Sequence, residues 1–357
     1  MGRIGVESVR DAAGGRPLRR PSACGSWALV LTLVVGFAAC YDRATRTRDR
    51  PKAVERAAPE AQVGREEYDG AVWRLAYSPT GDLLAVITIK GGVALKETAT
   101  GRPIVLSNGG PSSARVLAFT PDGRTLAVAG QGPVVRLWDA RTAREWPPLH
   151  VRGGTRVDGL AFSPDGARLT VGLWDGPLAD WDWRRGRRLD GPGRPIGGVT
   201  AVALAPDGAT LATGDAHGRV VVWGPSDPRG RAAAGHRNRV GSLAFAPDGR
   251  SLASASPGDA TVCVSDAATG ALKYTLTYKH TGVTSVAFSP DGTLLAAAHA
   301  DGEARLFDAA TGRPRGVAAC DRMPYALAFS PDGATLATGD HGGSVRFWSV
   351  ARLLKEP

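Results

Sequence analysis

The sequence contains few of the residues on which covalent or metal chemistry depends. Only four cysteines and six histidines occur among 357 residues, and no two cysteines form a CxxC pair. Cysteine this sparse excludes a small domain held together by disulfide bonds. No Gly-x-Ser-x-Gly nucleophile motif, phosphate-binding loop or HExxH pair occurs either. We therefore predict no catalytic residue, no cofactor and no metal site.

Long apolar runs are also missing. The most apolar stretch, residues 27–40, is shorter than the roughly 20 residues that a membrane-spanning helix needs. Arg16, Arg19 and Arg20 precede it, which is the order of an export signal. It ends in the letters FAAC, which resemble the lipobox of bacterial lipoproteins, whose cysteine (here Cys40) becomes acylated. Two interpretations stay open, a lipoprotein signal and an uncleaved anchor helix. We predict a membrane-tethered protein of the cell envelope with an exported propeller, and for an uncleaved helix the side of the membrane stays open.

The net charge of +10 is unevenly distributed. Residues 1–60 contain eleven basic and six acidic side chains, whereas residues 61–357 contain 33 and 28. A basic surplus usually suggests a nucleic-acid partner. Half of it, however, belongs to the signal or anchor at 1–40 and to an Arg-rich stretch at 41–60 that we interpret as a solvated tether. We therefore do not expect a nucleic-acid partner.

Beyond residue 60 the chain is repetitive. The tag Pro-Asp-Gly begins at Pro121, Pro164, Pro206, Pro247, Pro290 and Pro331, and the degenerate copy Pro79-Thr80-Gly81 begins the series. Successive tags are 41 to 43 residues apart, so seven units fill residues 61–357. Chain length alone suggests two or three domains. The repeat replaces that estimate with a single domain of seven units.

Each tag separates two short apolar runs, as in LAFSPDGARLTVG at residues 160–172. Proline, aspartate and glycine in this order are typical of a hairpin turn, so the flanking runs are predicted to be antiparallel strands. A third run and a weaker fourth run complete each unit. Seven four-stranded units predict an all-β protein, a seven-bladed β-propeller of antiparallel blades.

The repeated pattern V..LAFSPDG..LA.G...G.VRLWD resembles the WD40 repeat over residues 61–357. The tryptophan position of that repeat is occupied by Trp138, Trp181, Trp223, Phe307 and Trp348, and by Lys96 and Ser265 in the two remaining units. Another propeller family with SPDG tags, found in Tol-system and prolyl-oligopeptidase proteins, is the alternative, and the LWD and FWS strings favour WD40. The resemblance implies that a strand near residues 60–66 completes the last blade. The hydrogen-bonded His–Ser/Thr–Asp–Trp set of the family is poorly matched, because a Gly-His pair precedes only the fifth unit, at His236.

The resemblance also implies a protein-interaction scaffold whose partner docks on the top face. In WD40 proteins the inner strand of each blade starts there, at the mouth of the central channel. The residues that differ between units at this point are our candidate partner-binding residues: Trp73, Tyr325, Met323, Arg115, Arg156 and Asp158. We predict a non-catalytic, monomeric propeller that binds a protein or peptide. The alternatives are aromatic side chains that only pad the channel mouth, and an enzyme or a small-ligand or metal-binding propeller that uses the channel.

Several other polar features have a structural interpretation. His217, His299 and His341 fall near blade turns and are interpreted as substitutes for the usual turn residues, rather than as metal ligands. Cys263 and Cys320 are predicted to be buried small side chains. A basic run contains Arg184, Arg185, Arg187, Arg188 and Arg194, and another contains Arg229, Arg231, Arg237 and Arg239. We interpret the first run as a solvated edge strand, because charge protects an edge from further pairing.

Overall fold

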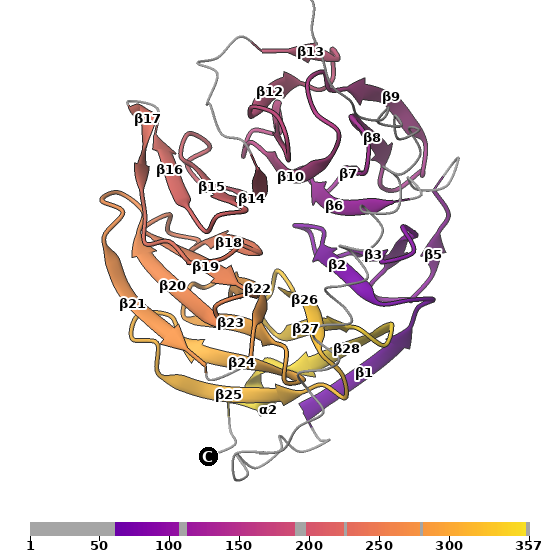
Figure 1. Cartoon of the computed structure of the whole chain (residues 1–357). Coiled ribbons are helices and arrows are strands. Elements are labelled where there is room, and N and C mark those ends of the chain that lie inside the picture. Colours follow the sequence, from indigo (N-terminus) through magenta and orange to yellow (C-terminus); the bar gives the residue numbers. More distant parts are fainter. Residues whose placement is uncertain (1–60, 107–112, 190–197, 225–226, 279–280, 355–357) are drawn as a thin grey trace, which may run out of the picture. The chain divides into compact units, whose positions relative to one another are not determined.

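Seven four-stranded antiparallel sheets make up the part of the chain that the structure, a computed structural model, describes. The described residues are 61–106, 113–189, 198–224, 227–278 and 281–354. The innermost strand of each sheet packs against those of the sheets before and after it. The first inner strand, β2 (Val72–Tyr77), packs against the last, β26 (Pro324–Phe329), so the sheets form a closed ring (Figure 1). The predicted seven-bladed propeller is confirmed.

We number the blades 1 to 7 in chain order, starting at β2. The remaining inner strands are β6 (Ala114–Phe119), β10 (Val157–Phe162), β14 (Val199–Leu204), β18 (Ser242–Phe245) and β22 (Val283–Phe288). The second strands are β3 (Leu83–Thr88), β7 (Thr125–Gly130), β11 (Arg168–Leu173), β15 (Leu211–Asp215), β19 (Ser251–Ser256), β23 (Leu294–His299) and β27 (Thr335–Asp340). The third strands are β4 (Val93–Glu97), β8 (Val134–Asp139), β12 (Ala179–Asp182), β16 (Val220–Gly224), β20 (Thr261–Asp266), β24 (Glu303–Asp308) and β28 (Ser344–Ser349). The outer strands are β5 (Pro103–Ile104), β9 (Glu145–His150), β13 (Arg187–Arg188), β17 (Asp227–Ala232), β21 (Leu272–Thr277), β25 (Pro314–Ala319) and, in blade 7, β1 (Gln62–Glu67).

The Pro-Asp-Gly tags form the turns between inner and second strands, and blade 3 shows how. The Ser163 hydroxyl donates a hydrogen bond to Asp165 (2.5 Å) and accepts one from the backbone N–H of Arg168 (2.9 Å). Asp165 also accepts the N–H of Ala167 at 2.9 Å, and the hydrogen bond from Ser163 holds its pKa below the usual range. Gly166 has a φ of +65°, a conformation that glycine adopts without strain. Local hydrogen bonds therefore fix each hairpin, which explains why the tag recurs.

The core lies between the blades. Every residue of β3, β7 and β23 is buried, because neighbouring blades cover both faces of a second strand. Small side chains in these strands let the blades approach closely. At Gly339 in β27, an added Cβ would stand 2.3 Å from the Cγ1 of Val72 in blade 1. A larger residue there would push blade 7 away from blade 1.

Blade 7 combines the two ends of the described chain. Strand β1 pairs antiparallel with β28, with Gln62 opposite Trp348 and Glu67 opposite Ser344. The backbone groups of β28 that face outward are thereby hydrogen-bonded, although an unpaired edge in a ring would invite aggregation. One helical turn, α2 (Val350–Leu353), follows β28, with Leu353 buried.

The repeat tryptophan position lies in the third strand of every blade and is buried. Trp138 is fully buried, and Trp181, Trp223, Phe307 and Trp348 are at most 7% exposed. Blade 1, which has Lys96 here, is adjacent to the closing strand. The Lys96 ammonium pairs with Glu66 of β1 and lies 5.0 Å from the centroid of the Phe347 ring. Its charge is therefore matched by the strand that closes the ring.

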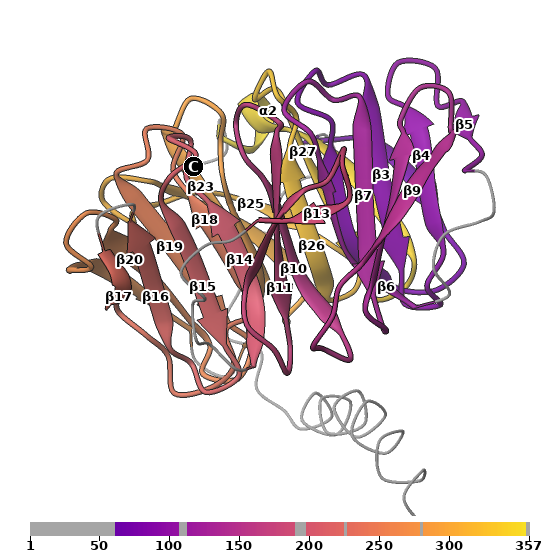
Figure 2. The same cartoon turned by 90° about the horizontal axis from the view of Figure 1, so that it is seen from above.

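The two faces of the propeller carry different connections (Figure 2). Because each blade is antiparallel, the loops entering the inner strands and the turns between second and third strands lie at one end, which we call the top face. The Pro-Asp-Gly turns lie at the other end.

The predicted signal or anchor at 1–40, with Cys40, and the predicted tether at 41–60 fall outside the described residues. Among the residues that are described, no helix is long and apolar enough to cross a membrane.

Candidate functional site

An aromatic pair stands at the top of two neighbouring inner strands. Trp73 lies near the start of β2 and Tyr325 near the start of β26, and their ring centroids are 5.4 Å apart, with planes tilted by 45°. Both residues are half-buried. The ring of Tyr325 also lies 5.7 Å from that of His341, whose backbone N–H donates to the carbonyl of Met323 (2.9 Å). Closure of the ring therefore brings Trp73 and Tyr325 together from opposite ends of the repeat array, and Met323 lies two residues before Tyr325 in the loop before β26.

Two of the predicted arginines share one buried carboxylate beside this pair. The side chain of Asp158, near the start of β10, is 3% exposed. One of its oxygens accepts a hydrogen bond from Arg115 Nε at 3.2 Å, and the other accepts from Arg156 Nε and Nη2 at 3.0 and 2.5 Å. The guanidinium of Arg115 also lies 5.3 Å from the centroid of the Trp73 ring. The predicted residues Arg115, Arg156 and Asp158 thus form one ion-paired group next to Trp73.

Two further arginines approach the same carboxylate without pairing with it. Arg74 donates to the carbonyl of Trp73 (3.0 Å), and its guanidinium lies 5.6 Å from the centroid of the Trp73 ring. Burial lowers the pKa of Arg74 to about 10; the positive charges of Arg239 and Arg115 lower it further, and Asp158 opposes them. Burial also lowers the pKa of Arg239, against the attraction of Asp158. Asp158 therefore attracts four guanidiniums, two of them through ion pairs and two at longer range.

Sequence reasoning missed Arg74, although a signal was present. Arg74 occupies the position five residues before the tag proline. The other six units carry small or aliphatic residues at this position: Val116, Gly159, Ala201, Ser242, Ser285 and Ala326. An arginine that occurs in only one of seven equivalent positions indicates a function specific to that blade. Arg239 belongs to the second basic run of the sequence, and in the structure its charge also interacts with Asp158 and with Arg74.

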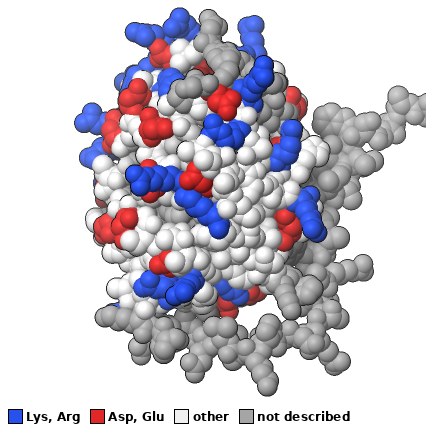
Figure 3. All heavy atoms as spheres, turned by 90° about the vertical axis from the view of Figure 1, so that its left-hand side faces the viewer, with Lys and Arg blue, Asp and Glu red and all other residues white. Residues whose placement is uncertain are grey.

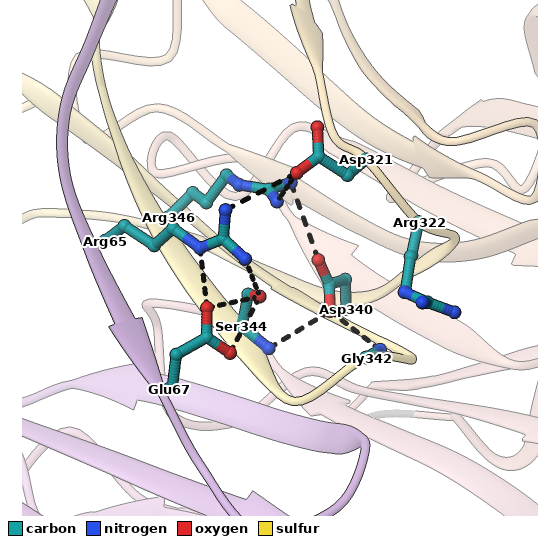
Figure 4. Close-up of a pocket in the computed structure, with 8 residues that line it drawn as sticks. All are labelled: Arg65, Glu67, Asp321, Arg322, Asp340, Gly342, Ser344 and Arg346. Atoms are coloured by element: carbon teal, nitrogen blue, oxygen red, sulfur yellow. Dashed lines mark hydrogen bonds and ion pairs between the residues drawn. The ribbon is translucent and has the colours of Figure 1, made fainter.

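Blade 7 has a pocket of about 470 Å³ on the top face, and two of its lining residues, Asp340 and Gly342, flank His341 in the turn after β27. Its lining residues are Arg65, Glu67, Asp321, Arg322, Asp340, Gly342, Ser344 and Arg346 (Figure 4). Three basic and three acidic side chains line it, so its walls have no excess charge.

The ion pairs of this pocket tie the closing strand to the rest of blade 7. The side chain of Arg346 is 2% exposed; it hydrogen-bonds Asp321 and lies 3.5 Å from Asp340. On β1, Arg65 pairs with Glu67 at 2.6 Å, and Glu67 accepts the hydroxyl of Ser344 at 3.0 Å (Figure 4). These contacts join β1, β28 and the loop before β26. Their role is therefore structural: they hold the closing strand β1 in place on blade 7.

The three histidines near blade turns lie in different environments. His217 and His341 are exposed at turns. The interpretation of His299 as a turn residue is wrong, because it is the last residue of β23 and is fully buried. Its ring lies 4.1 Å from that of Tyr278, and burial lowers its pKa to about 3. Among the described residues, no group of three or more His, Cys, Asp or Glu side chains is placed to hold a metal ion.

Both described cysteines, Cys263 and Cys320, are buried and form no disulfide bond, and burial raises the pKa of Cys320 to about 11.

The first basic run lies on an outer edge: Arg187 and Arg188 form β13 and are exposed, while Arg185 pairs with Asp182 at 3.0 Å. On the side of the propeller at the left of Figure 1, basic and acidic side chains are interspersed (Figure 3). No large patch of one charge is visible on that side.

Comparison with known proteins agrees with the repeat pattern. The family described as "WD domain, G-beta repeat" matches residues 187–224, 231–266, 270–308 and 320–349. The family described as "Anaphase-promoting complex subunit 4 WD40 domain" matches residues 75–153. Together these matches cover more than half of the chain. The chain belongs to the WD40-repeat family.

The WD40 relatives are distant. "Telomerase protein component 1" of Rattus norvegicus is 29% identical over 184 residues, which are 51% of this chain and 7% of the relative. "WD repeat-containing protein SL1-17" of Schistosoma mansoni is 30% identical over 152 residues, 42% of this chain and 49% of the relative. "Target of rapamycin complex subunit wat1" of Schizosaccharomyces pombe is 33% identical over 111 residues, 30% and 34% of the two chains. This chain thus spans less than half of each relative.

Parts of the WD40 hydrogen-bond set are present, in different blades. In blade 5, His236 bonds Thr261 through Nδ1 (2.8 Å) and Ser254 through Nε2 (2.9 Å). In blades 4 and 7, the indole N–H of Trp223 and that of Trp348 each donate to a threonine hydroxyl at 2.9 Å. Blade rigidity therefore rests on different partial sets and on packing between the sheets.

Proposed function

We propose that this WD40 propeller is a non-catalytic interaction scaffold that docks a protein or peptide on its top face. The observation that carries the proposal is the aromatic pair of Trp73 and Tyr325, half-buried at the start of two inner strands and bordered by Arg115. Trp, Tyr and Arg are enriched among the few residues that dominate the binding energy of protein interfaces. The alternative is that the two rings only pad the mouth of the channel. Padding would not require the guanidiniums of Arg74 and Arg115 beside Trp73.

The relatives support a role in assemblies. One carries the name of a component of telomerase and another that of a subunit of the target of rapamycin complex. A propeller scaffold serves many unrelated functions, so the fold by itself does not name the partner. The proposal for this chain therefore depends on the side chains that differ between its blades.

Capture of a cellular partner tests the docking site. The full-length chain is used as bait in three variants: Trp73→Ala, Tyr325→Ala and the control Trp146→Ala. Trp146 lies on the outer strand β9 and is 46% exposed, so its removal changes a comparable aromatic surface elsewhere. Loss of a central aromatic anchor costs about 2 kcal/mol or more, a factor of about 30 in affinity. We expect the first two variants to lose the partner and the control to retain it, and unchanged recovery with all three contradicts the proposal.

We also propose that the N-terminal segment tethers the propeller to a membrane of the cell envelope. The support comes from the sequence alone: arginines, an apolar run and a cysteine after small residues, at positions 16–40. Mass spectrometry and membrane fractionation of Cys40→Ala test the lipid anchor. We expect loss of acylation and release of the protein. Membrane association of an unacylated wild-type protein would indicate an anchor helix instead.

A further inference from the structure

The charges around the ring axis do not balance. Arg74 comes from β2, Arg115 from β6, Arg156 from the loop before β10 and Arg239 from the loop before β18. Asp158 attracts all four, and both of its oxygens already accept hydrogen bonds from Arg115 and Arg156. Within the described part of the chain, Arg74 and Arg239 make no ion pair. Four blades thus contribute four positive charges around Asp158, and one further carboxylate, the exposed Asp175, attracts Arg156.

Such an arrangement is costly unless something else binds there. Arg74 and Arg239 are partly withdrawn from water and repel each other and Arg115. A guanidinium can donate up to five hydrogen bonds, and within the described residues the only hydrogen bond of the Arg74 guanidinium goes to the carbonyl of Trp73. Most donors of these two arginines therefore remain available for an anionic group. The adjacent rings of Trp73 and Tyr325 offer an apolar surface to whatever carries that group.

We propose that Arg74 and Arg239 bind carboxylate side chains of an acidic peptide segment, with an apolar residue of the same segment on Trp73 and Tyr325. This inference rests on the proposed docking function and names the chemistry of the partner. Arginine suits this task because its planar fork matches a carboxylate with two parallel hydrogen bonds. Asp158 would keep its own pairs and hold Arg115 and Arg156 beside the incoming segment.

A peptide fits these residues better than a nucleic acid. The cluster is confined to the innermost strands and the loops that lead into them, whereas a nucleic acid needs a basic track with successive aromatic stacking positions. The other basic run, at β13, lies on an outer strand and therefore does not extend the cluster. A short acidic segment needs only the few arginines that are present.

Selection from a phage-displayed library of random heptapeptides tests the proposal. The full-length chain is compared with Arg74→Gln, Arg239→Gln and the control Arg237→Gln. Arg237 is exposed and two residues from Arg239, so its variant makes the same change in the same loop. We expect the wild type and the control to enrich peptides rich in Asp and Glu, and the other two variants to lose that enrichment. Calorimetry with one selected peptide should then show affinity at least about tenfold weaker for Arg239→Gln and for the Asn/Gln version of the peptide, because each removes a charge-assisted hydrogen bond.

A selected pool without excess Asp and Glu overturns the proposal, as does acidic enrichment that survives in Arg74→Gln and Arg239→Gln. Binding of a 20-nucleotide single-stranded DNA that Arg239→Gln weakens, without an acidic peptide pool, assigns the cluster to nucleic acid instead. Capture of a cellular partner that depends on Trp73 but not on Arg239 leaves the docking function standing and overturns the acidic-segment inference. Both arginine variants are expected to melt no lower than the wild type, because each removes an unpaired, partly buried charge.

Discussion

Asp158→Asn is the perturbation that tests the charge arrangement at the ring axis most simply. The substitution keeps the size of the side chain and removes its charge. Arg115 and Arg156 then lose the carboxylate that accepts their hydrogen bonds, and Arg74 and Arg239 lose the negative charge nearest to them. The four guanidiniums would then repel one another, with only the exposed Asp175 left to attract Arg156. We therefore expect a lower free energy of unfolding.

The size of the effect follows from the burial of the groups. Breaking a buried ion pair by removing one partner costs about 3–5 kcal/mol. The Asp158 side chain is 3% exposed, but the side chains of Arg115 and Arg156 are 25% and 22% exposed, so water compensates part of the loss. We expect a loss of about 2–3 kcal/mol. In a domain of this size each kcal/mol lowers Tm by about 2 °C, so the predicted fall is about 4–6 °C.

A double-mutant cycle separates repulsion from simple loss of packing. Urea unfolding followed by tryptophan fluorescence is measured for Asp158→Asn, Arg239→Gln and the double variant. Because Arg239 is one of the repelling charges, its removal should reduce the cost of Asp158→Asn. The reasoning is refuted if Asp158→Asn costs less than about 0.5 kcal/mol, or if the two changes add to within about 0.5 kcal/mol, the error expected for independent sites.

Three further predictions concern the scaffold. His299 is buried with a pKa lowered to about 3, so its contribution to stability is complete above the unfolded pKa of about 6.5 and is lost as the pH falls toward 3. Between pH 6.5 and 4.5, the unfolding free energy of His299→Leu should therefore fall less steeply than that of the wild type, and parallel curves would contradict this. Trp138→Ala should cost about 3–5 kcal/mol in urea unfolding, whereas Trp146→Ala should cost less than about 1 kcal/mol because its ring is 46% exposed; equal losses would contradict this. Deleting Gln62–Glu67 should expose the edge of β28 and cause concentration-dependent association in size-exclusion chromatography, and a stable monomer would show that β1 is dispensable.

The sequence predicts the blades well because their determinants are local. Each Pro-Asp-Gly tag is fixed by hydrogen bonds within a few residues, as Ser163 and Asp165 show, so the hairpin can be read from the tag. The third strand is marked by its buried aromatic residue, as at Trp138 and Trp348. Outer strands are less predictable because they are exposed and short; β5 and β13 have only two residues each. The seven-fold count follows from tags that recur every 41 to 43 residues.

The candidate site was only partly predictable from the sequence, because its residues come from blades that are far apart in the chain. Ring closure brings blade 1 to blade 7, and the central channel brings blades 1, 3 and 5 near one another. Comparison between repeats found Trp73 and Tyr325, because the residue at this position differs from one unit to the next. The same comparison did not reveal that Arg74 and Arg239, which come from blades 1 and 5, act on the same carboxylate. His299 was misread because the position after a second strand is normally a turn, whereas this strand continues through the histidine. Burial of that kind depends on the neighbouring blade, which a single repeat does not specify.

Site-specific photo-crosslinking in the native cell tests the central claim, docking on the top face, most directly. A photoreactive amino acid replaces His341, which is exposed and whose ring lies 5.7 Å from that of Tyr325. The control position is Leu272, 53% exposed on the outer strand β21. We predict one discrete crosslinked protein from position 341 that disappears when Trp73→Ala is added, and none from position 272. The same crosslink from both positions, or one from 341 that persists with Trp73→Ala, would contradict docking at this site.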